Sequence, residues 1–472
     1  MRRTFENFKS FVLTILIILS LVLTGSLWFD NYQGLSLIAS SMYGNVINNF
    51  NNIIEEDESI IYDKIIVPQK VTVVNLDTNR WIFYSTDNMN TSTWNIIRER
   101  LDSLAPETEI ITGQVREWDN LFNRKAIILE FGGALAHDIL KLAIPNLPKE
   151  TNAFENVEKI AITKSLDGNT IYILQNNKNK KALYKVLLKG DEDIIDYVIS
   201  NCNNVKTDVK YVELAKVGTT KFYNNKEVVP ASTVLFPVFN TPSHRNTVKA
   251  LRTSYHFNME DEYSINRFIT ETFKNADFAK FITNDESSIF INDDKSSIKF
   301  EKNGIMEYTN NSKLSGEIVS PNKNFNAAMD FINNMRINNI YLQSADEDNG
   351  LYTFKFYMAI DGTMAGFKTP IIDDDLHTII EIQVKEGNVR YFKGKLLDME
   401  LQDKGVNVSN FTHNIMDNLL RDISANSKIN VSFLEKMYVI DNTGTYYPNW
   451  LLKYNLKKSD PEVVLLTNTV KR

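Results

Sequence analysis

The stretch KIAITKSLDGNTIYILQNNKNKKALYKVLL, residues 159–188, shows most directly how this chain folds. Two runs of alternating apolar and polar residues flank Asp167-Gly168, and Asp-Gly between such runs is a strong signal for a β-hairpin. A third alternating run follows the polar turn at 176–181. The stretch therefore predicts three antiparallel strands joined by tight turns.

Outward from this meander, helical segments are set apart from runs of strand. Alternation of period two after Pro68 predicts paired strands, and STWNIIRERLDSL at 92–104 has apolar residues at helical spacing behind Ser/Thr caps. Further helices are expected at 134–143, 191–202, 264–273, 325–335 and 410–423. Helices segregated from antiparallel strands predict an α+β fold, and no segment predicts a parallel βαβ array.

We expect an N-terminal transmembrane helix followed by about three extracytoplasmic domains of antiparallel sheet plus helices. The expected parts are a cytoplasmic tail at 1–10, the transmembrane helix at 11–29, a juxtamembrane stalk at 30–65, a first outer domain at 66–150, a central outer domain at 151–312 and a C-terminal domain at 313–472.

The expected anchor is an uncharged run of nineteen residues, Phe11 to Phe29. At about 1.5 Å per residue a helix of this length spans roughly 28 Å, close to the hydrocarbon thickness of a bilayer. A cleavable secretion signal has a shorter apolar core of about 7–15 residues. We therefore expect the run to remain as an anchor, with cleavage as the alternative.

The flanks of the run predict its orientation. Arg2, Arg3 and Lys9 precede it, and Trp28 lies at its far end, where aromatic residues favour the membrane interface. We expect a single-pass protein of the cell membrane. Because basic residues prefer the cytoplasmic side, its N-terminus is expected in the cytoplasm and its bulk outside the cell.

Composition excludes some classes of function. The chain has a net charge of −7, and its first ten residues carry +2, so −9 falls on the rest. Such a surface offers no electrostatic attraction for nucleic acid. Cys202 is the only cysteine, so no internal disulfide can form and packing must hold the domains together.

No residue pattern predicts a catalytic, cofactor-binding or metal site. The five histidines, His137, His244, His256, His377 and His413, show no metal-ligand spacing. The segments 346–350 and 373–375 are acidic, but the first lacks the calcium-loop spacing and the second is interpreted as a solvated turn. Cys202 is interpreted as a buried apolar residue.

Two adjacent glycines in FGGALAH, residues 131–137, follow a predicted buried strand and precede a predicted helix. Phosphate can bind at such a helix N-terminus, but neither the P-loop lysine nor the GxGxxG pattern is present. We interpret the glycines as a tight strand-to-helix turn.

The order of several stretches resembles the YycH family, also called WalH. These stretches are FVLTILIILSLVLTGSLWF at 11–29, IIVPQKVTVVNLDTNRWIFYST at 65–86, STWNIIRERLDSL at 92–104, SSIFINDDKSSIKFEKNGIMEY at 287–308 and YYPNWLLKYN at 446–455. Residues 325–455 are also similar to the YycI companion. The chain departs from the family pattern at Phe131-Gly132-Gly133, where a proline-containing stretch is more usual.

The resemblance implies an accessory regulator of the YycG/WalK sensor kinase of a cell-wall two-component system. In that family the anchor helix associates with the transmembrane helices of the kinase, and YycH and YycI together restrain it. The resemblance implies no enzymatic activity and no cofactor.

The anchor offers one face for such an association. Ser20 and Thr24 share a face with Leu13 and Ile17, and a secondary strip holds Thr14, Leu21 and Gly25. Helices in lipid associate through close packing and interhelical hydrogen bonds, which small hydroxyl residues permit. The alternative is that these hydroxyls bond only to carbonyls of their own helix.

Two other functions stay open from the sequence. The outer part could bind a cell-envelope ligand, or it could be an anchored cell-wall hydrolase whose catalytic groups meet only in three dimensions. A shallow aromatic pocket would favour the first, paired carboxylates in a deep cleft the second, and flat surfaces the regulator.

Overall fold

The computed structural model describes 23 stretches of the chain, with the following ranges: 58–76, 80–104, 108–148, 152–165, 168–177, 180–188, 193–205, 209–213, 221–222, 226–230, 234–239, 246–256, 262–273, 279–282, 288–292, 295–301, 304–360, 362–367, 378–408, 428–440, 445–446, 448–456 and 463–467. The chain divides into two compact units, Met1–Ile61 and Tyr62–Arg472. The predicted anchor, its contact face and most of the stalk lie outside the described residues. Within the described ranges, no helix is long and apolar enough to cross a membrane.

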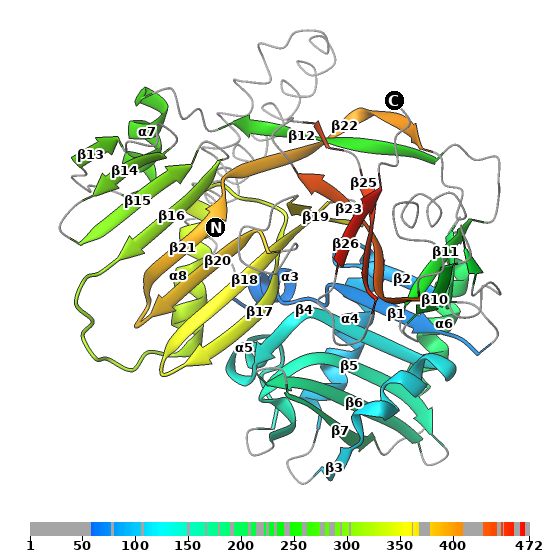
Figure 1. Ribbon diagram of the computed structural model, residues 1–472. Helices are drawn as coiled ribbons and strands as arrows, with labels where there is room; N and C mark the ends of the chain where they lie inside the picture. The colour runs from blue at the N-terminus through cyan, green and yellow to red at the C-terminus, as the bar shows by residue number, and fades with distance from the viewer. Residues whose placement is uncertain are drawn as a thin grey trace, which may run out of the picture. The chain divides into compact units, whose positions relative to one another are not determined.

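The first sheet has seven strands, all antiparallel, in the order β2-β1-β4-β5-β6-β7-β3. Its strands are β1 (Lys70–Val74), β2 (Arg80–Tyr84), β3 (Ile110–Gly113), β4 (Ala126–Ala136), β5 (Asn156–Ser165), β6 (Gly168–Asn177) and β7 (Lys180–Leu188). β5 to β7 form the predicted meander and lie side by side in Figure 1. The hairpin predicted at Asp167-Gly168 is confirmed, because Ser165 pairs with Gly168.

Alternation along these strands gives the first sheet two buried faces. One face takes Val71, Val73, Ile127 and Leu129 into the large core, which also holds residues of α4 (Asn88–Asp102), α5 (His137–Ala143) and α6 (Ile194–Asn204). The opposite face, with Val74 and Ile128 among its residues, packs under the 3₁₀ turns η1 (Val115–Glu117) and η2 (Asp119–Asn123). A third 3₁₀ turn, η3 (Asn152–Phe154), precedes β5. Because successive side chains point to opposite faces of a strand, each strand contributes to both of these buried layers.

The second sheet is an antiparallel array of eight strands in the order β13-β14-β15-β16-β21-β20-β18-β17. Its strands are β13 (Ala279–Ile282), β14 (Ser288–Asn292), β15 (Ser296–Glu301), β16 (Ile305–Asn310), β17 (Ile340–Asp348), β18 (Leu351–Ile360), β20 (Ile380–Lys385) and β21 (Asn388–Lys395). Helices α7 (Glu262–Phe273) and α8 (Pro321–Asn334) pack on it through aromatic side chains, Phe331 lying 5.3 Å from Phe392 between ring centroids.

Strands from distant segments pair near the C-terminus. β19 (Thr363–Phe367) and β10 (Lys226–Pro230) both run parallel to β23 (Lys428–Ile440), which pairs with β25 (Pro448–Asn455) and then β26 (Val463–Thr467). β19 also pairs antiparallel with β18 of the second sheet. Further pairings are β9 (Lys221–Phe222) with β10, β11 (Leu235–Phe239) with β8 (Val209–Glu213), and β12 (Asn246–His256) with β22 (Leu397–Val408) and β24 (Thr445–Tyr446). The two parallel pairs of β23 join strands that lie far apart in the sequence, so no local pattern could predict them.

The two sheets meet where β17 runs beside the end of β4, with Ala345 opposite Leu135. The interpretation of Gly132-Gly133 as a strand-to-helix turn is wrong, because both lie inside β4. A Cβ atom at Gly132 would lie 2.7 Å from Gln343 Cγ, and one at Gly133 would lie 2.8 Å from Ser344 Cβ. The glycines therefore permit close approach of β17.

The fold of the described residues is mixed α+β, as predicted. Both sheets cross the domain boundaries expected from the sequence, because β5 pairs with β4 and β16 pairs with β21. Those positions are therefore not breaks in hydrogen bonding, and the division into domains stays a prediction. Of the stalk, the structure describes α3 (Glu58–Ile65) at its end, which is helical.

Candidate functional site

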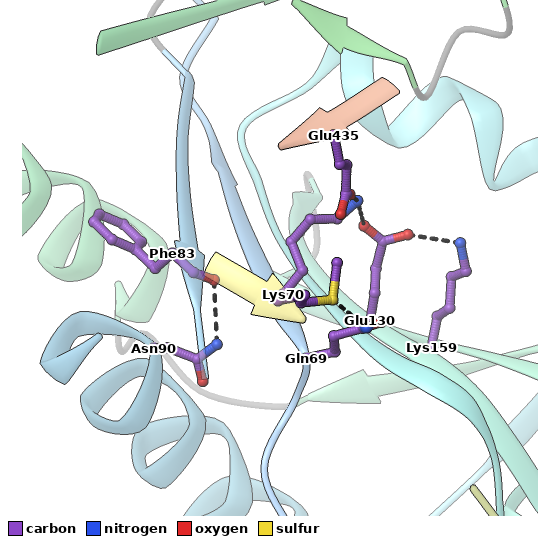
Figure 2. Close-up of polar contacts among 8 residues, drawn as sticks. Gln69, Lys70, Phe83, Asn90, Glu130, Lys159 and Glu435 are labelled. Carbon is purple, nitrogen blue, oxygen red and sulfur yellow. Dashed lines mark hydrogen bonds and ion pairs between the residues drawn. The ribbon is translucent and has the colours of Figure 1, made fainter. Parts of the chain in front are cut away.

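Four charged side chains meet at the edge between the first sheet and β23, and we call them the charge network. They are Lys70, Lys159, Glu130 and Glu435 (Figure 2). Lys70 Nζ lies 2.8 Å from Glu130 Oε2 and 2.8 Å from Glu435 Oε1, and Lys159 Nζ lies 2.6 Å from Glu130 Oε1. None of the four side chains is more than 21% exposed. The two positive and two negative charges balance.

Strand register places three of these residues. Glu130 on β4 stands between Lys70 on β1 and Lys159 on β5, and it pairs directly with each of them. Cross-strand neighbours of opposite charge stabilise a sheet. Glu435 comes from β23, 365 positions after Lys70, so the network ties the C-terminal strands to the first sheet.

The network keeps its groups ionised. Burial opposes the charge of Glu130, but Lys159 and Lys70 outweigh it and lower the pKa of Glu130 to about 2. Burial also opposes the charge of Lys70, yet the carboxylates of Glu130 and Glu435 raise the pKa of Lys70 above its ordinary value. General acid–base catalysis needs a pKa moved toward neutrality, and these shifts run the other way. The arrangement suits a structural joint.

Polar contacts continue around the network. Gln69 Nε2 donates to Met364 Sδ on β19, and the backbone N–H of Gly362 donates to Thr86 Oγ1, which joins the β18–β19 turn to the end of β2. Asn90 Nδ2 on α4 donates to the carbonyl oxygens of Pro68 and Phe83 at 3.0 and 3.2 Å. These bonds fix β1, β2 and α4 where the second sheet meets them.

A second cluster lies where the chain leaves the stalk, at Tyr62 and Asp63 of α3. Tyr62 Oη donates to Asn326 Oδ1 at 3.0 Å and also to Asn322, both on α8. The Tyr62 ring packs edge-on against Phe325 at 5.7 Å. Asp63 forms an ion pair with Arg98 of α4. The end of α3 is thus bound to α4, which belongs to the first sheet's core, and to α8, which packs on the second sheet.

Some of the sequence candidates for chemistry turn out to be local structure. Asn349 and Gly350 form the two-residue turn between β17 and β18, with φ of 53° and 75°, and Gly350 N donates to Glu347 Oε1. That geometry is a hairpin turn. Cys202 is buried as expected, and burial raises the pKa of its thiol to about 12. Among the described residues, no three His, Cys, Asp or Glu side chains gather as a metal site requires.

Several candidates cannot be placed. The anchor-face residues, the interface anchors, residues 373–375 and the histidines at 244, 377 and 413 lie outside the described residues. Only the backbone of His256 is described, in β12, while His137 begins α5. The predicted contact face therefore stays a prediction.

Sequence reasoning missed the charge network. One signal was available, since Glu130 interrupts the otherwise apolar run AIILEF at 126–131. A charge in a strand buried on both faces needs a partner. Nothing local identified Lys70, Lys159 or Glu435 as that partner.

Comparison with known proteins gives a likeness of fold. No protein-family model matches the chain. No curated protein matches it. Among solved structures it is similar to YycH from Bacillus subtilis, with a TM-score of 0.48 and 11% identity over 86% of this chain and 96% of that one. It is also similar to the C-terminal domain of YpeB from Bacillus megaterium, with a TM-score of 0.25 and 13% identity over 44% of this chain and 98% of that one.

At 11% identity, the similarity concerns the fold alone.

Proposed function

We propose that this chain is a non-enzymatic regulator anchored in the cell membrane by one helix, with its N-terminus cytoplasmic and its bulk outside. It modulates, and restrains, a cell-wall sensor histidine kinase of the YycG/WalK type together with a YycI-like companion. The anchor helix and the outer domains both make contact. The order of sequence stretches, which resembles the YycH family, supports this proposal.

The observation that carries the proposal is the attachment of α3. Tyr62 bonds to Asn322 and Asn326 of α8, and Asp63 pairs with Arg98 of α4. A loosely tethered enzyme or ligand-binding module has no need for such contacts. A regulator that acts through its anchor does, because the outer domains must hold the end of the stalk in one position.

The charge network supports the non-enzymatic part. Its lysines and glutamates neutralise one another, and the pKa of Glu130 lies far from neutrality. Cys202, the only cysteine, has a raised pKa and is buried, so it is a poor nucleophile.

The test uses the full-length protein co-expressed with the kinase and the companion. Replacing Ser20 and Thr24 with Leu removes two hydroxyls from the predicted contact face and holds the backbones apart. Interhelical hydrogen bonds in membranes contribute about 0.6 kcal/mol on average and at most about 1.7, so with packing the loss is about 1–3 kcal/mol. Co-purification of the kinase should fall roughly five- to hundred-fold.

The matched control replaces Ile18 and Val22 with Leu, away from that face. Equal loss from both pairs, or no loss from either, removes the face from the proposal. Kinase activity in reconstituted vesicles should rise when the regulator is omitted. Turnover of peptidoglycan by the purified chain, abolished by changing one carboxylate or histidine, would instead favour the hydrolase.

A further inference from the structure

Strand β3 forms one edge of the first sheet. Among the described residues it pairs with β7 alone, so one side of its backbone has no described strand beside it. Ile111 and Thr112 in the middle of the strand are exposed, and so are residues 114–116 directly after it. The open side is therefore accessible. An edge of this kind presents unpaired N–H and C=O groups, on which another strand can pair.

Exposed apolar side chains gather at this edge. Ile111 is 41% exposed, and Leu187 on the neighbouring strand β7 is 43% exposed. Ile111 pairs with Lys185, two residues from Leu187, so the two apolar side chains lie on the same face of the sheet. Val115 is 38% exposed in η1, which the 2.5 Å ion pair between Glu117 and Lys185 holds beside β7. Single exposed apolar residues are common, but three that gather at an open edge indicate an interaction surface.

β3 lacks the features by which proteins usually protect an edge strand. Its four residues, Ile-Ile-Thr-Gly, include no charge and no proline. Its register with β7 runs from Ile110 opposite Val186 to Gly113 opposite Leu183 without a bulge. Charges, prolines and bulges on an edge strand prevent it from pairing with another chain. Only the short length of β3 limits such pairing, so contacts that flank the strand must contribute.

The flanks of β3 carry opposite charges. Glu109 precedes the strand and Arg116 follows it, and both are exposed. Within the described residues, Glu117 pairs with Lys185, whereas no ion pair joins Glu109 or Arg116 to another side chain. When two identical strands pair antiparallel, the start of each lies beside the end of the other. A second copy of this chain therefore supplies the complementary charge at both ends by symmetry.

We propose that β3 is the interface of a symmetric dimer, in which β3 of a second copy of this chain pairs antiparallel with it. The first sheets of the two copies then form one continuous sheet across the two-fold axis. The exposed surface of Ile111, Leu187 and Val115 is buried in both copies, and two Glu109–Arg116 pairs flank the strands. Two-fold symmetry requires a surface that is complementary to itself, and an uncharged strand with opposite charges at its ends meets that requirement. This contact is independent of the proposed function, since it involves neither the kinase nor the companion.

The test measures the dissociation constant of the dimer by analytical ultracentrifugation of the full-length protein in detergent. Glu109→Arg places an arginine beside Arg116 at both ends of the strand pair and should weaken the dimer roughly three- to thirty-fold. The double variant Glu109→Arg/Arg116→Glu restores opposite charges and should recover the affinity. Both residues are exposed, so neither variant should have a lower melting temperature. A double variant that stays as weak as Glu109→Arg would contradict antiparallel pairing of β3.

Ile111→Lys tests the strand contact itself. A lysine on an edge strand opposes pairing, so the dimer should weaken at least roughly ten-fold. The matched control is Leu76→Lys, because Leu76 is 63% exposed and follows β1, near the opposite edge of the sheet. This control should leave the dissociation constant unchanged. Any contact between anchor helices is common to all variants, so the difference between the two lysine variants reports the strand.

Cysteine variants give a second readout. A two-fold axis near the middle of β3 brings the same residue of both copies to about 4.5–5.5 Å between Cα atoms, a separation that suits a disulfide. Oxidation should link Ile111→Cys or Thr112→Cys into a covalent dimer, and Leu76→Cys should stay unlinked. The native Cys202 is buried and does not compete. A monomer at every concentration, with neither strand variant linked, overturns the proposal, and so does a dimer that Glu109→Arg and Ile111→Lys both leave intact.

Discussion

Glu130 and Glu386 both tie together segments that lie far apart in the sequence, but they do so in different surroundings. Glu130 is 13% exposed and bonds to the ammonium groups of Lys70 and Lys159. Glu386 lies in a surface turn and bonds to a hydroxyl and two backbone N–H groups of loop 311–320. Removing the first takes away the partner of Lys159 and leaves Lys70 with Glu435 alone. Removing the second leaves groups that water can reach.

Loss of Glu130 and loss of Glu386 should therefore have different measurable consequences. The interior glutamate supports the stability of the whole fold, because uncompensated charge in a sheet is costly. The surface glutamate holds one loop, and its loss should affect the conformation of that loop. The predictions below test the interior side of this contrast, from the largest expected effect to the smallest.

The largest effect is expected from Glu130→Ala. The substitution leaves Lys159 without its partner and Lys70 with Glu435 alone, in a site where no side chain of the network is more than 21% exposed. Breaking a buried ion pair by removing one partner costs about 3–5 kcal/mol. The free energy of unfolding, measured by urea denaturation, should fall by that amount.

Glu307→Ala is the matched control. Glu307 also pairs with a lysine across two antiparallel strands, Lys393 at 2.9 Å, but both side chains are 25–27% exposed. This pair is more open to solvent than the charge network, so its contribution should be smaller and closer to the about 0–1 kcal/mol of a surface pair. Equal destabilisation by Glu130→Ala and Glu307→Ala would show that burial does not set the strength of these pairs.

The second prediction is acid destabilisation through Glu130. Its pKa in the folded state is about 2, lowered from an ordinary 4.5. A carboxylate with a lowered pKa contributes its stability above the unfolded value and loses it as pH falls toward the folded value. Between about pH 4.5 and pH 2 the protein should therefore lose about 3 kcal/mol from this group. Urea midpoints across that range measure the loss.

Glu130→Gln separates this group from the other carboxylates. The variant is less stable at neutral pH, and its urea midpoint should depend less steeply on pH in the acid range, because glutamine does not titrate. Parallel curves for the wild type and the variant would contradict the assignment of the acid transition to the network.

How far the sequence predicted these regions depends on the range of the contacts. The three-strand meander at 159–188 and the helices were predictable, because periodicity and turn residues are local signals. Glu130 within an apolar strand signalled an unidentified partner. Its connection to Glu435 through Lys70 was not predictable, because Lys70 and Glu435 are 365 positions apart and, among the described strands, β23 is attached to the second sheet only through its parallel pair with β19.

The contacts of the surface loop 311–320 were not predictable either, because they too join residues that are far apart in the sequence. The exposure of Ile318 and the bond from Ser315 to Glu386, 71 positions away, depend on how α8 packs on the second sheet. The glycine pair in β4 was noticed in the sequence but assigned to a turn. The structure instead places the side chains of Gln343 and Ser344 against those glycines, a contact that only the assembled fold specifies.

The third prediction tests the uncharged joint between the two sheets, with Gly133→Ala. A Cβ atom there would lie 2.8 Å from Ser344 Cβ, which cannot rotate away because it is attached directly to the backbone of β17. Overpacking of this kind costs about 1–3 kcal/mol. Urea denaturation should show this loss, and Ser344→Gly in the same chain should recover part of it.

Gly132→Ala provides the comparison at the same joint. Its Cβ would meet Gln343 Cγ at 2.7 Å, an atom that can move by rotating the side chain. We expect a smaller loss than at Gly133. A larger loss at Gly132, or no recovery in the Gly133→Ala/Ser344→Gly double variant, would contradict close approach of β17 as the reason for the glycines.

The smallest effect is expected from Tyr62→Phe. This substitution removes a neutral hydroxyl, whereas the comparison above concerned charged groups. The side chain is 6% exposed, and its hydroxyl donates to Asn326 and Asn322 while its ring packs on Phe325. Phenylalanine keeps the ring contact and removes the hydrogen bonds, so the free energy of unfolding should fall by about 1 kcal/mol. Hydrogen exchange should increase at the end of α3 and in the first turns of α8, and it should stay unchanged around Glu130. Faster exchange throughout the first sheet would show instead that the attachment of α3 and the charge network form one cooperative unit, and the contrast between a stabilising interior and a conformation-setting surface would then not hold for this part of the molecule.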